Sequence, residues 1–159
     1  MYISYKEYTA LYDNFDEKLF NRLAFDACQH IDRLTTGVDG VKKLKEAFPS
    51  NEDDAAAVKR CAAHIVNFLY QIHEAEISAS VGRGYEQTDK GLRGRVISSV
   101  SAGTESVSYS TGAQRTAVDA AAASPAERNR MIRESIREYL SGVADNNGVN
   151  LLYMGRYPS

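Results

Sequence analysis

The cysteines and histidines are the residues whose types and spacing come nearest to those of a reactive site. Cys61 and His64 occupy positions i and i+3 of a helical pattern, so a thiol and an imidazole share one helix face. A cysteine nucleophile also requires exposure and an electropositive setting. Cys61 instead belongs to the apolar stripe of its segment, which predicts a buried thiol, and we therefore expect no nucleophile here.

A zinc site would need two more ligands, and Cys28 with His30 is the available pair. Residues two apart on a helix point about 200° away from each other, so these two cannot reach the same ion. The stretch "GRGYEQ" lacks the third glycine of a dinucleotide fingerprint and follows a helix rather than a strand. The sequence thus predicts no catalytic residue, no metal and no cofactor.

Basic residues gather in the glycine-rich stretch "SVGRGYEQTDKGLRGR" at 80–95, namely Arg83, Lys90, Arg93 and Arg95. Such a cluster is typical of contact with phosphate or with an acidic protein surface, although a solvated loop explains it equally well. Tyr85 is the only aromatic residue among them, so stacking on single-stranded nucleic acid is not expected. We favour a protein partner over sequence-specific DNA.

The elements that would position these residues are mainly helical. The chain has 159 residues, which indicates one domain. Its net charge of −2 argues against a protein that wraps nucleic acid with its whole surface. Apolar residues recurring at three and four positions predict a small bundle of about four to five helices, at 5–12, 16–34, 41–48, 50–78 and 124–141. We assign residues 1–159 to one domain, with its helical core at 4–78 and 124–142.

Capping residues support these helix boundaries. Ser4, Ser50 and Ser124 each begin a pattern typical of a helix start. Gly37 and Gly142 follow predicted helix ends, where glycine adopts the left-handed conformation at little cost.

Two segments fall outside the helical pattern. Residues 79–123 are predicted to form an arm, with a loop at 79–94, a serine-rich hairpin of strands 96–100 and 106–110, and a helix or flexible link beyond it. The hairpin's apolar members are Val96, Ile97, Val107 and Tyr109. Residues 143–159 are predicted to form an extended apolar tail without a partner inside the chain.

No apolar run is long enough to span a bilayer, and the polar, acidic beginning "MYISYKEYTALYDNFDEK" lacks the pattern of a signal peptide. We therefore expect synthesis in a cytosol, no export and no membrane association. In a reducing compartment the two cysteines are expected to be free thiols.

Four stretches together resemble the head-tail connector, or adaptor, proteins of long-tailed bacteriophages and prophages. They are "FNRLAFDACQHIDRLTTG", "VKRCAAHIVNFLYQI", "VISSVSAGTESVSYS" and "REYLSGVADNNGVNLLYMGR". The most specific part is the final helix with its "LLYMG" tail, following the hairpin. The resemblance covers most of the chain.

The resemblance implies a structural virion protein rather than an enzyme, assembled in the host cytoplasm and placed in the virion neck. It would form a ring of about twelve copies beneath the portal protein, joined below to a neck or head-closure (stopper) protein. DNA would pass through the lumen without sequence reading. The implied portal-docking strip is Leu151, Leu152, Tyr153 and Met154, and the hairpin would contact neighbouring copies.

An alternative function is a DNA-packaging accessory or small DNA-binding protein. It predicts salt-sensitive duplex binding centred on the four basic residues of the arm.

Overall fold

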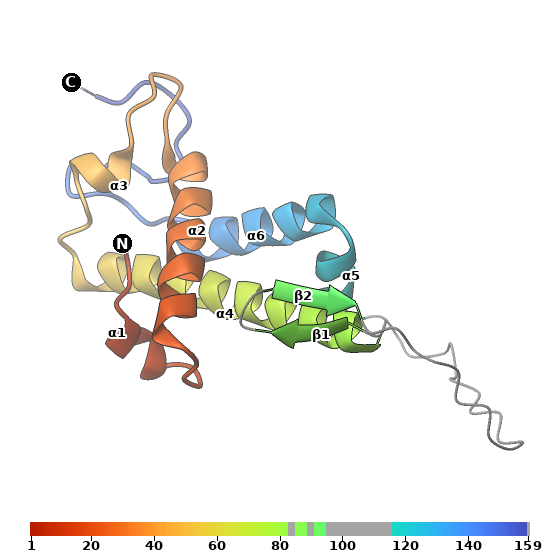
Figure 1. The fold of residues 1–159 in the computed structure, drawn as a ribbon. Coiled ribbons are helices and arrows are strands. Elements are labelled where there is room, and N and C mark those ends of the chain that lie inside the picture. Colours follow the sequence, from red (N-terminus) through yellow and green to blue (C-terminus); the bar gives the residue numbers. More distant parts are fainter. Residues whose placement is uncertain (83–84, 89–90, 95–115, 159) are drawn as a thin grey trace, which may run out of the picture.

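The protein is a helical bundle, seen here in a computed structural model that describes residues 1–82, 85–88, 91–94 and 116–158 (Figure 1). Within these residues the helices are α1 (Tyr5–Thr9), α2 (Glu17–Thr35), α3 (Lys43–Glu46), α4 (Glu52–Gly82), α5 (Ala117–Ala123) and α6 (Pro125–Leu140). The strands β1 (Tyr85–Thr88) and β2 (Gly91–Gly94) pair antiparallel. The predicted mainly helical fold is confirmed.

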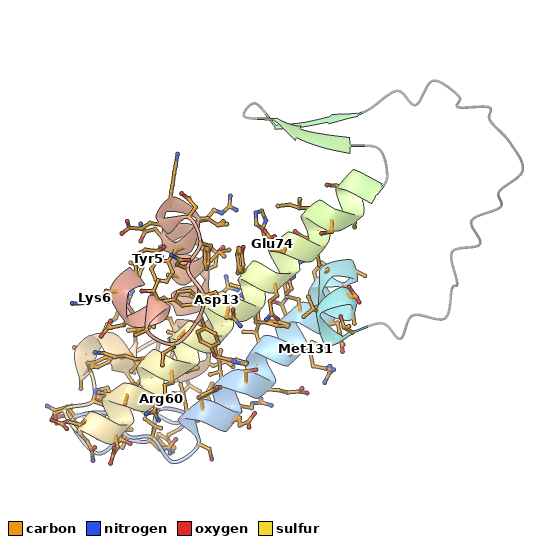
Figure 2. All side chains as sticks on the ribbon, turned by 90° about the horizontal axis from the view of Figure 1, so that it is seen from below. Tyr5, Lys6, Asp13, Arg60, Glu74 and Met131 are labelled. Carbon is orange, nitrogen blue, oxygen red and sulfur yellow. The ribbon has the colours of Figure 1, made fainter. Side chains whose placement is uncertain are left out.

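Helix α4 is the centre of the bundle. It contacts α2, α5 and α6, and Figure 2 shows it running side by side with α6. Because other helices cover α4 on more than one side, its buried residues are not confined to one helix face. They include the adjacent residues Ala62 and Ala63. Their small side chains let neighbouring helices approach closely.

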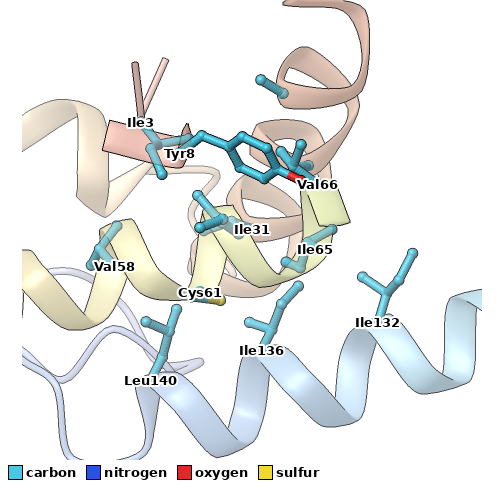
Figure 3. Packing of buried hydrophobic residues seen from close by; sticks show 14 of the residues in the cluster. Ile3, Tyr8, Ile31, Val58, Cys61, Ile65, Val66, Ile132, Ile136 and Leu140 are labelled. Atoms are coloured by element: carbon cyan, nitrogen blue, oxygen red, sulfur yellow. The ribbon is translucent and has the colours of Figure 1, made fainter. Parts of the chain in front are cut away.

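The core between these helices is apolar and closely packed. Figure 3 shows Ile132, Ile136 and Leu140 of α6 directed toward the face of α4 that carries Cys61. These three residues follow the four-residue spacing of one helix face and are at most 1% exposed. Ile31 of α2 completes the same cluster from another element.

Aromatic side chains anchor the short α1 to the bundle. Tyr8 is fully buried and packs 5.3 Å, centroid to centroid, from Phe20 of α2. Phe15, in the connection between α1 and α2, stacks on Tyr70 of α4 at 4.1 Å. These contacts fix a five-residue helix that is too short to be stable by itself.

The helix boundaries follow the predicted caps in part. Ser4 forms a capping box with Glu7, Ser124 accepts a hydrogen bond from the Glu127 amide, and Gly142 has a φ of 80°. Ser50 was the wrong cap for α4, because Asn51 accepts the hydrogen bond of the Asp53 amide at 2.9 Å.

The predicted arm differs from the structure at both of its ends. Residues 79–94 are not a loop throughout, since α4 continues to Gly82 and the strands β1 and β2 follow. Residues 117–123 form α5, which packs on α4 and α6 and buries Ala121, so they belong to the bundle. The predicted strands 96–100 and 106–110 lie outside the described residues.

Within the described part of the chain, no helix is both long and apolar enough to cross a bilayer.

Replacing Ile136 with alanine tests the packing of α6 on α4. Ile136 is fully buried, so Ile136→Ala is expected to lower the free energy of unfolding by about 2–5 kcal/mol. The adjacent, exposed Arg137→Ala is the control and should change stability by less than about 0.5 kcal/mol. Urea denaturation measures both, and equal effects would contradict the packing described here.

The ion pair between Glu7 and Lys59 should make part of the protein's stability depend on pH in the acid range. The Lys59 ammonium donates a 2.7 Å hydrogen bond to Glu7 and, with Ser4, lowers the pKa of this carboxyl from 4.5 to about 2. Because the folded pKa is lower, the contribution is present above pH 4.5 and is lost as the pH falls toward about 2.

Glu7→Gln should therefore flatten the stability profile between these pH values. Since the side chain is 43% exposed, screening limits the effect to at most about 1 kcal/mol. The exposed Glu74→Gln on α4 serves as control, and identical acid profiles for wild type and Glu7→Gln would argue against the pair.

Candidate functional site

The residues with the most reactive chemistry pack as structural side chains. Cys61 is fully buried as predicted, and desolvation raises the pKa of its thiol to about 12. His64 instead faces α6, with its Nε2 3.4 Å from the Ser135 hydroxyl and its ring against Tyr139. Cys28 is half-buried, and its sulfur accepts a hydrogen bond from the Tyr2 amide at 3.4 Å.

Metal ligation finds no support in the described residues. No group of three or more His, Cys, Asp or Glu side chains is placed there to hold an ion.

The C-terminal segment, residues 143–158, is the part of the structure that differs most from expectation. It was predicted to extend without a partner, but it packs against the α2–α3 connection and α3 (Figure 1). Leu151 is fully buried in the main core, and its amide donates to the Val143 carbonyl at 2.9 Å. The prediction of a free tail is therefore wrong.

Lys43 holds this segment in place. The side chain is fully buried, and its ammonium donates to the Leu151 carbonyl at 3.0 Å and to the Tyr153 carbonyl. Burial lowers the pKa of Lys43, while the nearby carboxylates of Asp145 and Asp39 raise it. The ammonium thus provides a donor for the buried carbonyl of Leu151 and for the partly buried carbonyl of Tyr153, in a segment without regular secondary structure.

A second polar network closes the segment on itself. Asp145 is 5% exposed, and one of its oxygens accepts from the amides of Asn147 and Val149, each at 2.9 Å. Its other oxygen accepts from the Tyr157 hydroxyl at 2.6 Å. Desolvation and this hydrogen bond raise the pKa of Tyr157. The Tyr157 amide donates to Asp39 at 2.6 Å, which ties the end of the segment to the α2–α3 connection.

Gly37 is required by close approach rather than by a left-handed conformation. It is not among the glycines with positive φ, so that part of the prediction was wrong. A Cβ at this position would lie 2.9 Å from the carbonyl oxygen of Gly155 and 2.8 Å from Asp39 Oδ1. A side chain at position 37 would therefore push the C-terminal segment away.

The docked segment presents an exposed surface that we call the apolar edge, made of Val38, Tyr153 and Met154. Val38 is 78% exposed, and Tyr153 and Met154 are each 51% exposed. The Val38 amide donates to the Met154 carbonyl at 3.3 Å, so the two chain segments are joined at this edge. Exposed apolar side chains gathered in this way are typical of a contact surface.

The predicted docking strip is thus divided by the structure. Leu151 faces the core, Leu152 is half-buried against it, and Tyr153 and Met154 are exposed. Seven further predicted site residues lie outside the described part of the chain: Val96, Ile97, Val107, Tyr109, Arg83, Lys90 and Arg95. Arg93 lies in β2, opposite Glu86 of β1 in register.

Sequence reasoning missed Val38, Lys43 and Asp145. The run "DNNG" at 145–148 was a usable signal, because Asp and Asn followed by Gly are typical of a tight turn held by the side chain. Lys43 had no such signal, since lysine is rarely fully buried.

Comparison with known proteins gives no assignment. No protein-family model, curated protein or solved structure matches this chain.

Removal of the Lys43 ammonium should loosen the C-terminal segment. Lys43→Met keeps the length of the side chain but leaves the two carbonyls without a donor, at a cost of about 1–3 kcal/mol each. Removing the buried ammonium also removes its desolvation cost, which offsets part of this loss. We expect amide hydrogen exchange at Leu151 and Tyr157 to accelerate at least tenfold, about 1.4 kcal/mol.

The control is Lys42→Met, which changes an exposed neighbouring lysine in the same way. Unchanged exchange in Lys43→Met, or equal acceleration in both variants, would show that the ammonium does not hold the segment.

Proposed function

We propose that this protein is a head-tail connector, a structural protein that forms a ring beneath a phage portal and joins it to the downstream neck or stopper protein. The observation that carries the proposal is the apolar edge, where Val38 and Met154 are joined through the backbone and stay exposed. Two of its three residues, Tyr153 and Met154, belong to the strip that the resemblance assigns to portal docking, whereas Val38 lies outside it.

The edge is suited to docking because it is already ordered. Its residues are fixed by the Lys43 and Asp145 networks, so little conformational entropy remains to be lost when a partner binds. Exposed apolar and aromatic side chains supply the contact area that protein interfaces use. The portal protein is the partner that we assign to this surface.

A ring also requires contacts between neighbouring copies. Such contacts join two different surfaces of each subunit. Phe25 of α2 is 61% exposed, and we assign it to such a contact. The net charge of −2 suits a ring that passes DNA without holding it.

The proposed portal contact is tested by the variant Val38→Ser/Met154→Ser. These side chains are exposed and neither takes part in the Lys43 contact, so the fold should be preserved. Wild-type protein is expected to form a complex with the portal of the same phage or prophage, and the variant to bind at least about tenfold more weakly. Light scattering and negative-stain imaging measure the assembly.

Leu11→Ser is the matched control, because Leu11 is 54% exposed and follows α1, and Figure 1 shows α1 and the C-terminal segment at opposite ends of α2. Normal assembly of the edge variant would contradict the proposed contact. Failure of the wild type to bind the portal, together with salt-dependent binding to duplex DNA, would favour a packaging accessory. Deletion of residues 149–159 would not test the portal contact by itself, because it also removes Leu151 from the core.

A further inference from the structure

Another surface lies between α2 and α6, and none of its lining residues belongs to the apolar edge. It is a depression of about 250 Å³ lined by His30, Arg33, Leu34, Asn129 and Arg133. Two arginines, a histidine and an asparagine therefore line one space, and no aspartate or glutamate is among its lining residues. This is unusual on a chain whose net charge is −2.

Two other arginines of α6, in contrast, are paired with carboxylates. Arg130 pairs with both Glu127 and Glu134, and Arg128 pairs with Glu76 of α4 at 2.7 Å. Within the described part of the chain, Arg33 and Arg133 form no ion pair with a carboxylate. Arg133 Nε donates to the carbonyl of Asn129, another residue that lines the depression, at 3.2 Å.

The pKa of His30 depends on burial and on the charged side chains around it. Its pKa is lowered first by burial and then by the positive charges of Arg33 and Arg128, while Asp26 on the solvent side of α2 opposes them. Burial and, after it, the neighbouring cations thus favour the neutral form of the imidazole. An anion placed between these groups would relieve the repulsion.

We infer that the depression between α2 and α6 binds a phosphate group, held by the guanidinium groups of Arg33 and Arg133. Guanidinium matches tetrahedral oxyanions through paired, charge-assisted hydrogen bonds. The Asn129 amide and the His30 imidazole are further donors on the same walls. The phosphate comes either free from solution or from the backbone of a nucleic acid. This inference does not depend on the connector role.

The test follows the His30 imidazole by proton NMR during titration with inorganic phosphate, with chloride keeping the ionic strength constant. His30→Gln assigns the signal among the three histidines. We expect a saturable shift and a higher pKa of His30 in the bound form, because the anion stabilises the imidazolium. Arg33→Gln/Arg133→Gln should weaken binding about tenfold or more and should raise the pKa of His30 without phosphate.

Arg137→Gln is the matched control, since it removes an exposed arginine of α6 that does not line the depression, and it should bind as the wild type does. No saturable change beyond that of chloride, or equal binding by the double variant, would overturn the inference. Melting curves of each variant confirm that the fold is kept.

A parallel titration with a short DNA duplex separates the two sources. Binding of the duplex that is lost in the double variant identifies a nucleic-acid phosphate. Saturation by inorganic phosphate, with a duplex that leaves His30 unchanged, identifies the free anion. If neither ligand shifts His30, the site does not exist.

Discussion

A single buried ammonium group supports the end of the molecule where the helices stop. The C-terminal segment has almost no regular secondary structure, yet Leu151 lies in the core, so its backbone carbonyls need partners away from water. Lys43 provides them for Leu151 and Tyr153. Its own charge is tolerated because it is surrounded by hydrogen-bond acceptors, with the carboxylates of Asp145 and Asp39 nearby. Without this arrangement the apolar core would be open at one end.

The proposed binding surfaces follow from the same construction. The apolar edge combines a residue of the α2–α3 connection with two residues of the C-terminal segment, and it exists only while these are docked together. The depression between α2 and α6 depends in turn on the crossing of two helices that pack on α4. One surface is apolar and the other cationic, so the two are suited to different partners and can be altered separately.

The helical part of this architecture could be predicted because its causes are local. Apolar spacing located α2, α4 and α6, and Ser124 and Gly142 marked the ends of α6 correctly. The docked segment could not be predicted in this way. The contact between Lys43 and Leu151 joins positions 108 residues apart, and nothing in the neighbouring sequence of either residue records it. The glycines of 82–94 similarly indicated a loop, whereas pairing between β1 and β2 produces strands there.

The long sequence separation between Lys43 and Leu151 also bears on the order of events in folding. Closing so large a loop costs more entropy than forming the contacts among α1, α2 and α4, so we place it late in folding. A chain that has not completed this step has no joined Val38–Met154 surface to offer. If assembly uses that surface as we propose, it would select completely folded subunits, and docking of the C-terminal segment would then act as a quality check before assembly.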